Sequence, residues 1–202
     1  EEAVWWSMLA LPAIYGALIV FPIASMTRDH FGKGAGVIAA WLIAFMPSHV
    51  THSTWALADH DAFILLFLSA GFMYYLRAVK AGGNERITRK VSAHPNSLFK
   101  AVSDVKIHKK AAIANAVAAG VCIGLVALGW KGFVYGPAII FLTYAVQVAL
   151  NMFRRKDSTV LSTVNLTMLL TVLIMTIPFY AHPQMNLVWN STGLQPLLFI
   201  IA

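Results

Sequence analysis

The feature that most constrains this chain is the alternation of long apolar runs with short polar connectors. The runs lie at about 4–26, 35–50, 62–79, 111–129, 133–153 and 159–181, and a further run begins near 196. A helix that crosses a bilayer needs about 20 apolar residues, and only helices or closed barrels satisfy their backbone groups there. With 59% hydrophobic residues, the sequence predicts an all-α polytopic transmembrane domain with six complete spans and the start of a seventh.

The two ends of the sequence predict a fragment of a longer protein. The chain opens on Glu1 rather than Met, and it stops at PLLFIIA, a few residues into an apolar run. We therefore expect residues 1–202 to be a fragment of one transmembrane domain. The longest polar segment, residues 81–110, carries no spacing typical of a catalytic or metal site and is expected to be a cytoplasmic loop.

The basic residues predict how the spans are oriented. All 15 Lys and Arg residues except Lys131 fall in or beside connectors that alternate along the chain, so these connectors would face the same side. Because cytoplasmic loops are rich in Lys and Arg, we expect an integral protein of the cell membrane with these loops in the cytoplasm. The loop with Asp59 and Asp61 would face outside. The net charge of +7 then points to membrane lipids, and not to nucleic acid, as the partner of the basic loops.

Two carboxylates lie close together in THSTWALADHDAF, between two apolar runs. In an extended segment, the side chains of Asp59 and Asp61 would share one face. Close carboxylates repel each other unless a cation lies between them, and oxygen ligands favour a hard divalent ion such as Mn²⁺ or Mg²⁺. The alternative is a pair of solvated loop carboxylates. Ionisable groups at a membrane edge tend to mark function, which adds weight to the metal interpretation and leaves both interpretations open.

Further residues on the predicted outer side are candidates for substrate contact. They are His52, Trp55, Trp130, Lys131 and Tyr135. A cation such as Lys131 would reduce the charge repulsion within a bound pyrophosphate, and Trp55 offers a ring for stacking on a sugar or lipid. Interfacial anchoring is the alternative, since Trp and Tyr are enriched at this depth and Lys can snorkel. His49 and His52 lack the third ligand that a zinc site needs.

Small residues at positions 120 and 124 predict a site of close helix packing. Gly120 and Gly124 form a G-x-x-x-G pattern inside an apolar run, which favours close approach of a neighbouring helix. The one cysteine, Cys122, lies in the same run and excludes an intrachain disulfide.

Two segments carry a resemblance to a known family. GKGAGVIAAWLIAFMPSHVTHSTWALADHDAF resembles the catalytic subunit of oligosaccharyltransferase, the STT3 family, and more closely its archaeal members, known as AglB. GWKGFVYGPAII resembles an outer turn between later spans of the same family. The resemblance implies a GT-C fold and transfer of an oligosaccharide from a dolichyl phosphate or pyrophosphate carrier to Asn of Asn-x-Ser/Thr in an acceptor protein. It also implies that Asp59 and Asp61 bind the catalytic Mn²⁺ or Mg²⁺.

The sequence departs from the family at two positions near this pair. His52 stands where family members often have Arg, and Ala56 stands where they often have Gly. A histidine is neutral above about pH 6.5, so His52 would hold an anion only weakly at neutral pH. The family's C-terminal soluble domain and its other metal-binding and acceptor-binding acids are expected outside this chain, so the fragment alone is expected to be inactive.

Three alternatives stay open on the sequence. The first is another GT-C glycosyltransferase that uses a lipid-phosphate sugar. The second is a transporter in which Asp59, His60 and Asp61 relay a proton or cation, although the spans lack the mid-membrane charges that a relay predicts. The third is a membrane scaffold without catalytic activity, in which neutralising the two aspartates would change only stability.

Overall fold

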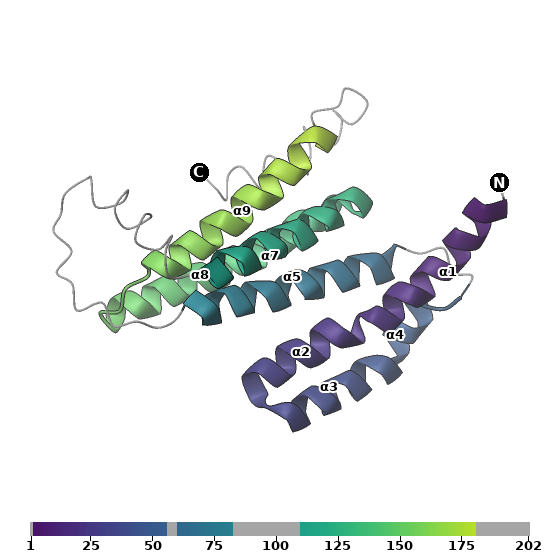
Figure 1. The fold of residues 1–202 in the computed structure, drawn as a ribbon, viewed down its shortest axis with the longest axis horizontal. Helices are drawn as coiled ribbons and strands as arrows, with labels where there is room; N and C mark the ends of the chain where they lie inside the picture. The colour runs from purple at the N-terminus through teal and green to yellow at the C-terminus, as the bar shows by residue number, and fades with distance from the viewer. Residues whose placement is uncertain (1, 56–59, 83–109, 181–202) are drawn as a thin grey trace.

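The computed structural model describes residues 2–55, 60–82 and 110–180. These residues form helices joined by short turns, with no strand among them (Figure 1). In chain order the elements are α1 (Glu2–Leu18), α2 (Val20–Phe31), α3 (Lys33–Phe45), α4 (Pro47–His52), α5 (Asp61–Gly82), α7 (Lys110–Gly129), η1 (Lys131–Val134), α8 (Tyr135–Phe153) and α9 (Thr159–Tyr180). The predicted all-α class is therefore confirmed.

Five helices in the described residues are long and apolar enough to cross a membrane. They are Leu9–Phe31, Asp61–Gly82, Lys110–Gly129, Gly132–Phe153 and Thr159–Pro178. They match the first, third, fourth, fifth and sixth predicted spans. The start of the seventh span near 196 and most of the predicted loop 81–110 lie outside the described residues.

The second predicted span, 35–50, differs from the structure because it is not one helix. Pro47 disfavours a helical conformation for the residue before it, and Met46 is extended, with φ −66° and ψ 117°. The helix α3 therefore ends at Phe45, and its 13 residues are too few for a span of about 20. Pro47 then begins α4, where a missing N–H is harmless.

The first span is also interrupted, at Ile19 between α1 and α2. Pro22 has no backbone N–H, so the carbonyl of Leu18 lacks the donor that a continuous helix would supply. Ile19 keeps helical dihedral angles, with φ −62° and ψ −24°, so the chain continues in the same general direction. At Gly32 the chain does reverse, with a φ of +94° that favours glycine, and α3 returns beside α2.

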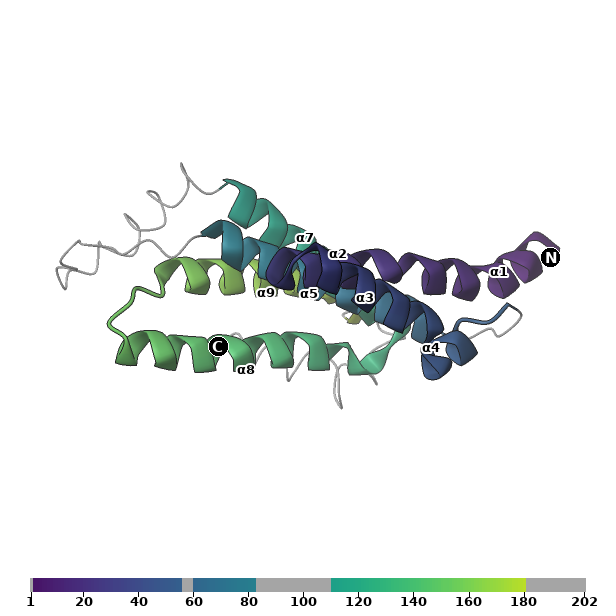
Figure 2. The same ribbon diagram turned by 90° about the horizontal axis from the view of Figure 1, so that it is seen from below.

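The core lies where α5, α7 and α9 pack side by side (Figure 1). Small residues of α7 make this packing close: Gly120 lies against Thr171 and Met168 of α9, and Gly124 lies against Met175. The close approach predicted from the G-x-x-x-G pattern is thus confirmed. The helix α8 runs in a separate layer and contacts α9 (Figure 2).

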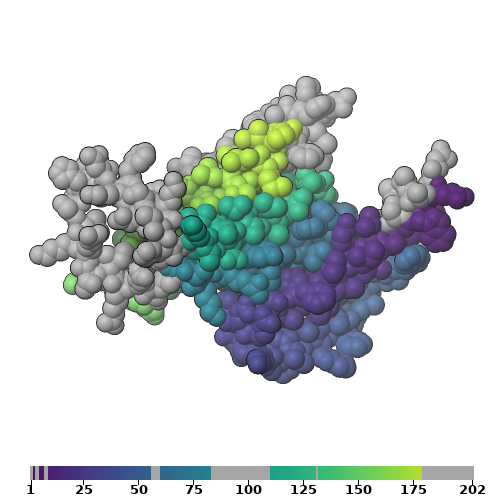
Figure 3. All heavy atoms as spheres, in the orientation of Figure 1, coloured from purple at the N-terminus to yellow at the C-terminus, as the bar shows by residue number. Residues whose placement is uncertain are grey.

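The helices α1 to α4 lie on the other side of α5 from α7 and α9, as the space-filling view shows (Figure 3). This arrangement gives α5 two different ends, separated by the 22 residues of the helix, or about 33 Å. At its C-terminal end, Arg77 contacts Asp29 of α2, and Gly82 contacts Val160 of α9. The turns α2–α3 and α8–α9, which carry basic residues, therefore lie towards the same end of α5.

Candidate functional site

A pocket of about 490 Å³ lies at the opposite end, where α5 begins. It is lined by Ile43, Met46, Ser48, His49, His52, Asp61, Ala62, Ile64, Leu65 and Trp130. These residues come from α3, α4, α5 and the turn before η1, so the pocket forms only when the elements pack together. It brings together three of the predicted site residues: His52, Asp61 and Trp130.

Asp61 is the first residue of α5, and its side chain is 51% exposed. The helix begins there because the N–H of Ile64 donates to the carbonyl of His60, at 3.0 Å. The N-terminus of a helix carries a partial positive charge, which stabilises a carboxylate at this position. Asp59 lies outside the described residues, so the predicted convergence of the two carboxylates stays a prediction.

Two histidines approach the Asp61 carboxylate. Nδ1 of His52 lies 3.3 Å from Oδ2 of Asp61, and Nε2 of His60 lies 3.9 Å from Oδ1. His52 is the last residue of α4, and eight residues of the sequence separate it from Asp61. The contact therefore joins the end of α4 to the start of α5 and orients the carboxylate beside the pocket.

The position of His52 depends on how α4 is held. His49 is buried, and its Nε2 lies 3.1 Å from the carbonyl oxygen of Gly16 in α1. Ser53 packs directly against Gly16, where no larger residue would fit. From the sequence, His49 was considered only as a zinc ligand, whereas in the structure its contact with the Gly16 carbonyl holds α4 against α1. No local sequence signal identifies this contact, because it joins residues 33 positions apart.

The predicted aromatic residues separate into two groups. Trp130 is half-buried and lines the pocket, and its ring lies 5.9 Å from the ring of Tyr135. Tyr135 and Trp55 are exposed, by 65% and 54%, and neither lines the pocket. The backbone of Lys131 begins η1, but its side chain lies outside what the structure describes. Substrate contact by Trp55, Lys131 and Tyr135 therefore stays a prediction.

The walls of the pocket add residues that the sequence did not single out. Ile43, Met46, Ile64 and Leu65 supply apolar surface beside the polar group formed by His52 and Asp61. Such a combination suits an amphipathic ligand with a charged head and an apolar chain. The sequence signal for these residues is only that of ordinary spans, so the pattern alone does not distinguish them from lipid-facing residues.

The described residues contain no group of three or more His, Cys, Asp or Glu side chains that would hold a metal by themselves. Asp61 nonetheless offers a solvent-accessible carboxylate, which is the donor that hard divalent ions take. A metal at this position would therefore need Asp59 or groups from elsewhere to complete its ligands.

Comparisons with known proteins agree on one family. The family model described as "Oligosaccharyl transferase STT3, N-terminal" matches residues 6–202. The "Dolichyl-phosphooligosaccharide-protein glycotransferase 3" of Archaeoglobus fulgidus is similar, with 29% identity over 142 residues. The match covers 69% of this chain but only 14% of that relative's length. No solved structure matches the chain.

Proposed function

This chain belongs to the oligosaccharyl transferase STT3 family, and we propose that the protein transfers an oligosaccharide from a dolichyl phosphate or pyrophosphate carrier to Asn of Asn-x-Ser/Thr in an acceptor protein. The family match over residues 6–202 is the observation that carries this proposal. The name of the archaeal relative, which includes dolichyl-phosphooligosaccharide and protein, supports the donor and the acceptor class.

The pocket at the start of α5 is the proposed place of transfer. Its apolar wall, which includes Ile64 and Leu65, would contact the first part of the lipid chain. The phosphate end of the carrier would then lie beside Asp61, and Trp130 would offer a ring on which a sugar can stack. We propose that this end of the molecule faces the outside of the cell membrane, because all the described basic residues near helix ends, except Lys131, lie at the other end.

We propose Asp59 and Asp61 as ligands of Mn²⁺ or Mg²⁺. Asp61 fits this role because its carboxylate is half-exposed beside a pocket, and His52 at 3.3 Å orients it. When bound, the ion would act as a Lewis acid and offset the negative charge of the leaving phosphate. The chain itself would hold the carrier in the pocket, keep the carboxylate in place and exclude part of the water around it.

The test is formation of glycopeptide by the full-length protein in membranes, supplied with a labelled Asn-x-Thr peptide, native lipid extract and Mn²⁺. We expect Asp59→Asn and Asp61→Asn each to abolish most of the product, and a chelator to do the same to the unmodified protein. A matched control is Asp157→Asn at the other end of the molecule. Asp157 accepts a hydrogen bond from Thr159 N at 3.0 Å, and an Asn oxygen retains that acceptor.

Each outcome of this assay is informative. Product that survives both substitutions at Asp59 and Asp61 would contradict the assignment of the two ligands. The absence of product from folded, unmodified protein with an intact donor would contradict transfer to peptide. In that case, product formed with a lipid-phosphate sugar and another acceptor would support the alternative GT-C glycosyltransferase.

A further inference from the structure

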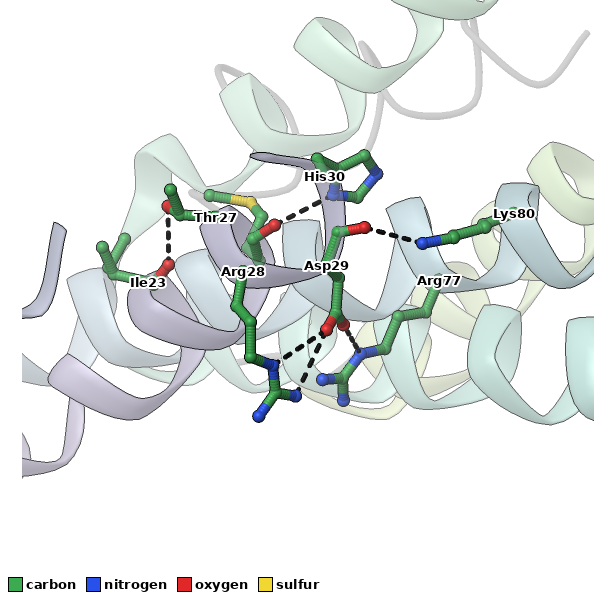
Figure 4. Close-up of polar contacts among 8 residues, drawn as sticks. Ile23, Thr27, Arg28, Asp29, His30, Arg77 and Lys80 are labelled. Atoms are coloured by element: carbon green, nitrogen blue, oxygen red, sulfur yellow. Dashed lines mark hydrogen bonds and ion pairs between the residues drawn. The ribbon is translucent and has the colours of Figure 1, made fainter. Parts of the chain in front are cut away.

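Three cationic side chains gather around one aspartate at the end of the bundle opposite the pocket (Figure 4). Arg77 Nε donates to Asp29 Oδ2 at 2.8 Å, and Lys80 Nζ donates to the Asp29 carbonyl at 2.6 Å. Arg28 donates from Nε and Nη2 to Asp29 Oδ1, at 3.3 and 3.2 Å. We call Arg28, Arg77 and Lys80 the cationic cluster.

The cationic cluster contains more positive charge than the packing of α2 on α5 requires. Arg77 and Lys80 already join α5 to the side chain and the carbonyl of Asp29 in α2. Arg28 adds no link between the helices, because it is adjacent to Asp29 in the same helix. Among the residues that the structure describes, the three cations surround a single carboxylate, which leaves a formal charge of +2. Like charges that are held together repel each other, so a second anion would stabilise the arrangement.

The two guanidinium groups also retain unused hydrogen-bond donors. Each has five N–H donors. In the described part of the chain, Arg28 uses its Nε and Nη2 atoms on Asp29, and Arg77 uses only Nε. Figure 4 shows both groups pointing to the same side of the helices. Their side chains are 54% and 31% exposed, so an anion can reach them. Paired guanidinium groups suit the oxygens of a phosphate.

The location of the cationic cluster points to a phospholipid as the source of such a phosphate. Arg28 lies in the last turn of α2, and Arg77 and Lys80 lie in the last two turns of α5, at the ends of two membrane-spanning helices. Phospholipid headgroups lie at this level of a bilayer. Phe31, the last residue of α2, is 80% exposed next to the cluster, and an apolar ring there suits the boundary between headgroups and acyl chains.

We propose that the cationic cluster binds the phosphate of an anionic phospholipid. Arg28 and Arg77 contact the phosphate oxygens, and Asp29 joins α2 to α5 through Arg77. The bound lipid therefore touches both α2 and α5, on the membrane side of their contact. This site is distinct from the pocket at Asp61 and does not depend on the proposed transferase activity.

The test measures lipid binding by the full-length protein in nanodiscs of phosphatidylcholine with increasing phosphatidylglycerol. Bound phosphatidylglycerol is counted by native mass spectrometry. We expect Arg28→Gln to weaken apparent affinity about fivefold, which corresponds to one cation near a membrane surface. Lys156→Gln removes an exposed cation from the α8–α9 turn at the same end and is the matched control, with no expected change. Equal losses in the two variants, or no loss in Arg28→Gln, would overturn the proposal.

A second variant separates lipid binding from a purely structural role. Asp29→Asn keeps all three cations but removes the carboxylate that links the helices. We expect its thermal stability in phosphatidylcholine to fall while its affinity for phosphatidylglycerol is retained or increases. If affinity falls together with stability in Asp29→Asn, the cluster is only structural and the proposal fails. The proposal also fails if inorganic phosphate, at the same phosphate concentration, stabilises the protein as much as phosphatidylglycerol does.

Discussion

At the scale of single residues, the contact between His52 and Asp61 has the most direct chemical consequence. A carboxylate with half of its surface in water can adopt several rotamers, and the contact with Nδ1 of His52 at 3.3 Å restricts it to fewer of them. Groups that orient a metal ligand in this way typically change metal affinity or activity by about 10- to 100-fold when they are removed. His52 is therefore a positioning residue in our account, and Asp61 is the proposed ligand.

This role predicts different effects for two substitutions of His52. The amide nitrogen of Asn occupies a position similar to Nδ1 of His, the atom that approaches Asp61. We expect His52→Asn to retain most glycopeptide formation and His52→Ala to reduce it about tenfold. The rates are compared at saturating peptide and at limiting Mn²⁺, where the orientation of a ligand matters most. Equal rates in the two variants would show that the contact has no positioning role.

At the scale of helices, a close contact implied by a short sequence motif could be predicted, whereas a contact between two distant segments could not. Gly120 and Gly124 were predicted to allow close packing, because their spacing places both on one face of a helix. The anchoring of α4 by His49 and Gly16 was not predicted, because nothing adjacent in sequence marks either residue as a partner of the other. The break at Met46 separates α3 from α4 where a continuous apolar run suggested one span.

Because α4 and the residue that follows it pack closely on α1 at Gly16, we expect Gly16→Ala to disturb the pocket. A methyl group on Gly16 would collide with the side chain of Ser53, which must then move α4 and with it His52. Overpacking of this kind costs about 1–3 kcal/mol, and we expect a lower thermal midpoint together with reduced transfer. Gly34→Ala is the control, because a methyl group there meets nothing within 4 Å. Equal thermal midpoints and equal transfer in Gly16→Ala and Gly34→Ala would contradict this close packing of α4 on α1.

The packing of α7 on α9 predicts unequal effects for its two glycines. A methyl group on Gly120 would lie 2.7 Å from the Met168 carbonyl oxygen, and backbone cannot move aside easily. On Gly124 it would lie 3.0 Å from Cβ and Sδ of Met175, a milder overlap that a small shift of Cβ and another rotamer of the flexible side chain would relieve. We therefore expect Gly120→Ala to lower the thermal midpoint in detergent more than Gly124→Ala does. The reverse order would mean that α7 and α9 approach each other elsewhere.

At the scale of the whole molecule, the described helices form a bundle with two chemically different ends. The end with Arg77, Lys80 and the α8–α9 turn is basic, and the end with the pocket carries Asp61. Five of the six complete predicted spans and this separation of charge could be predicted from the sequence, because a bilayer restricts the length and charge of every segment that crosses it. The pocket could not, because α3, α4, α5 and the turn at Trp130 meet there only through tertiary packing.

The proposed orientation predicts which end is accessible from outside the cell. In a Cys122→Ala background, residues 1–202 contain no other cysteine. We expect Thr54→Cys, next to α4, to react with a membrane-impermeant maleimide on intact cells, and Lys156→Cys to react only after the membrane is opened. Thr54 and Lys156 are both exposed, so access to solvent does not distinguish them. The opposite labelling pattern would show that the topology is the reverse of the proposed one and that the pocket faces the cytoplasm.

We propose that transfer depends on an ion bound by Asp61, and a titration of Mn²⁺ tests this dependence. Glycopeptide formation is measured against Mn²⁺ concentration for the unmodified full-length protein, for Asp61→Asn and for the control Asp157→Asn. We predict that Asp61→Asn raises the Mn²⁺ concentration for half-maximal rate by at least about tenfold, while Asp157→Asn leaves it unchanged. A variant at Asp61 that transfers more slowly with the same half-maximal Mn²⁺ concentration would contradict the claim.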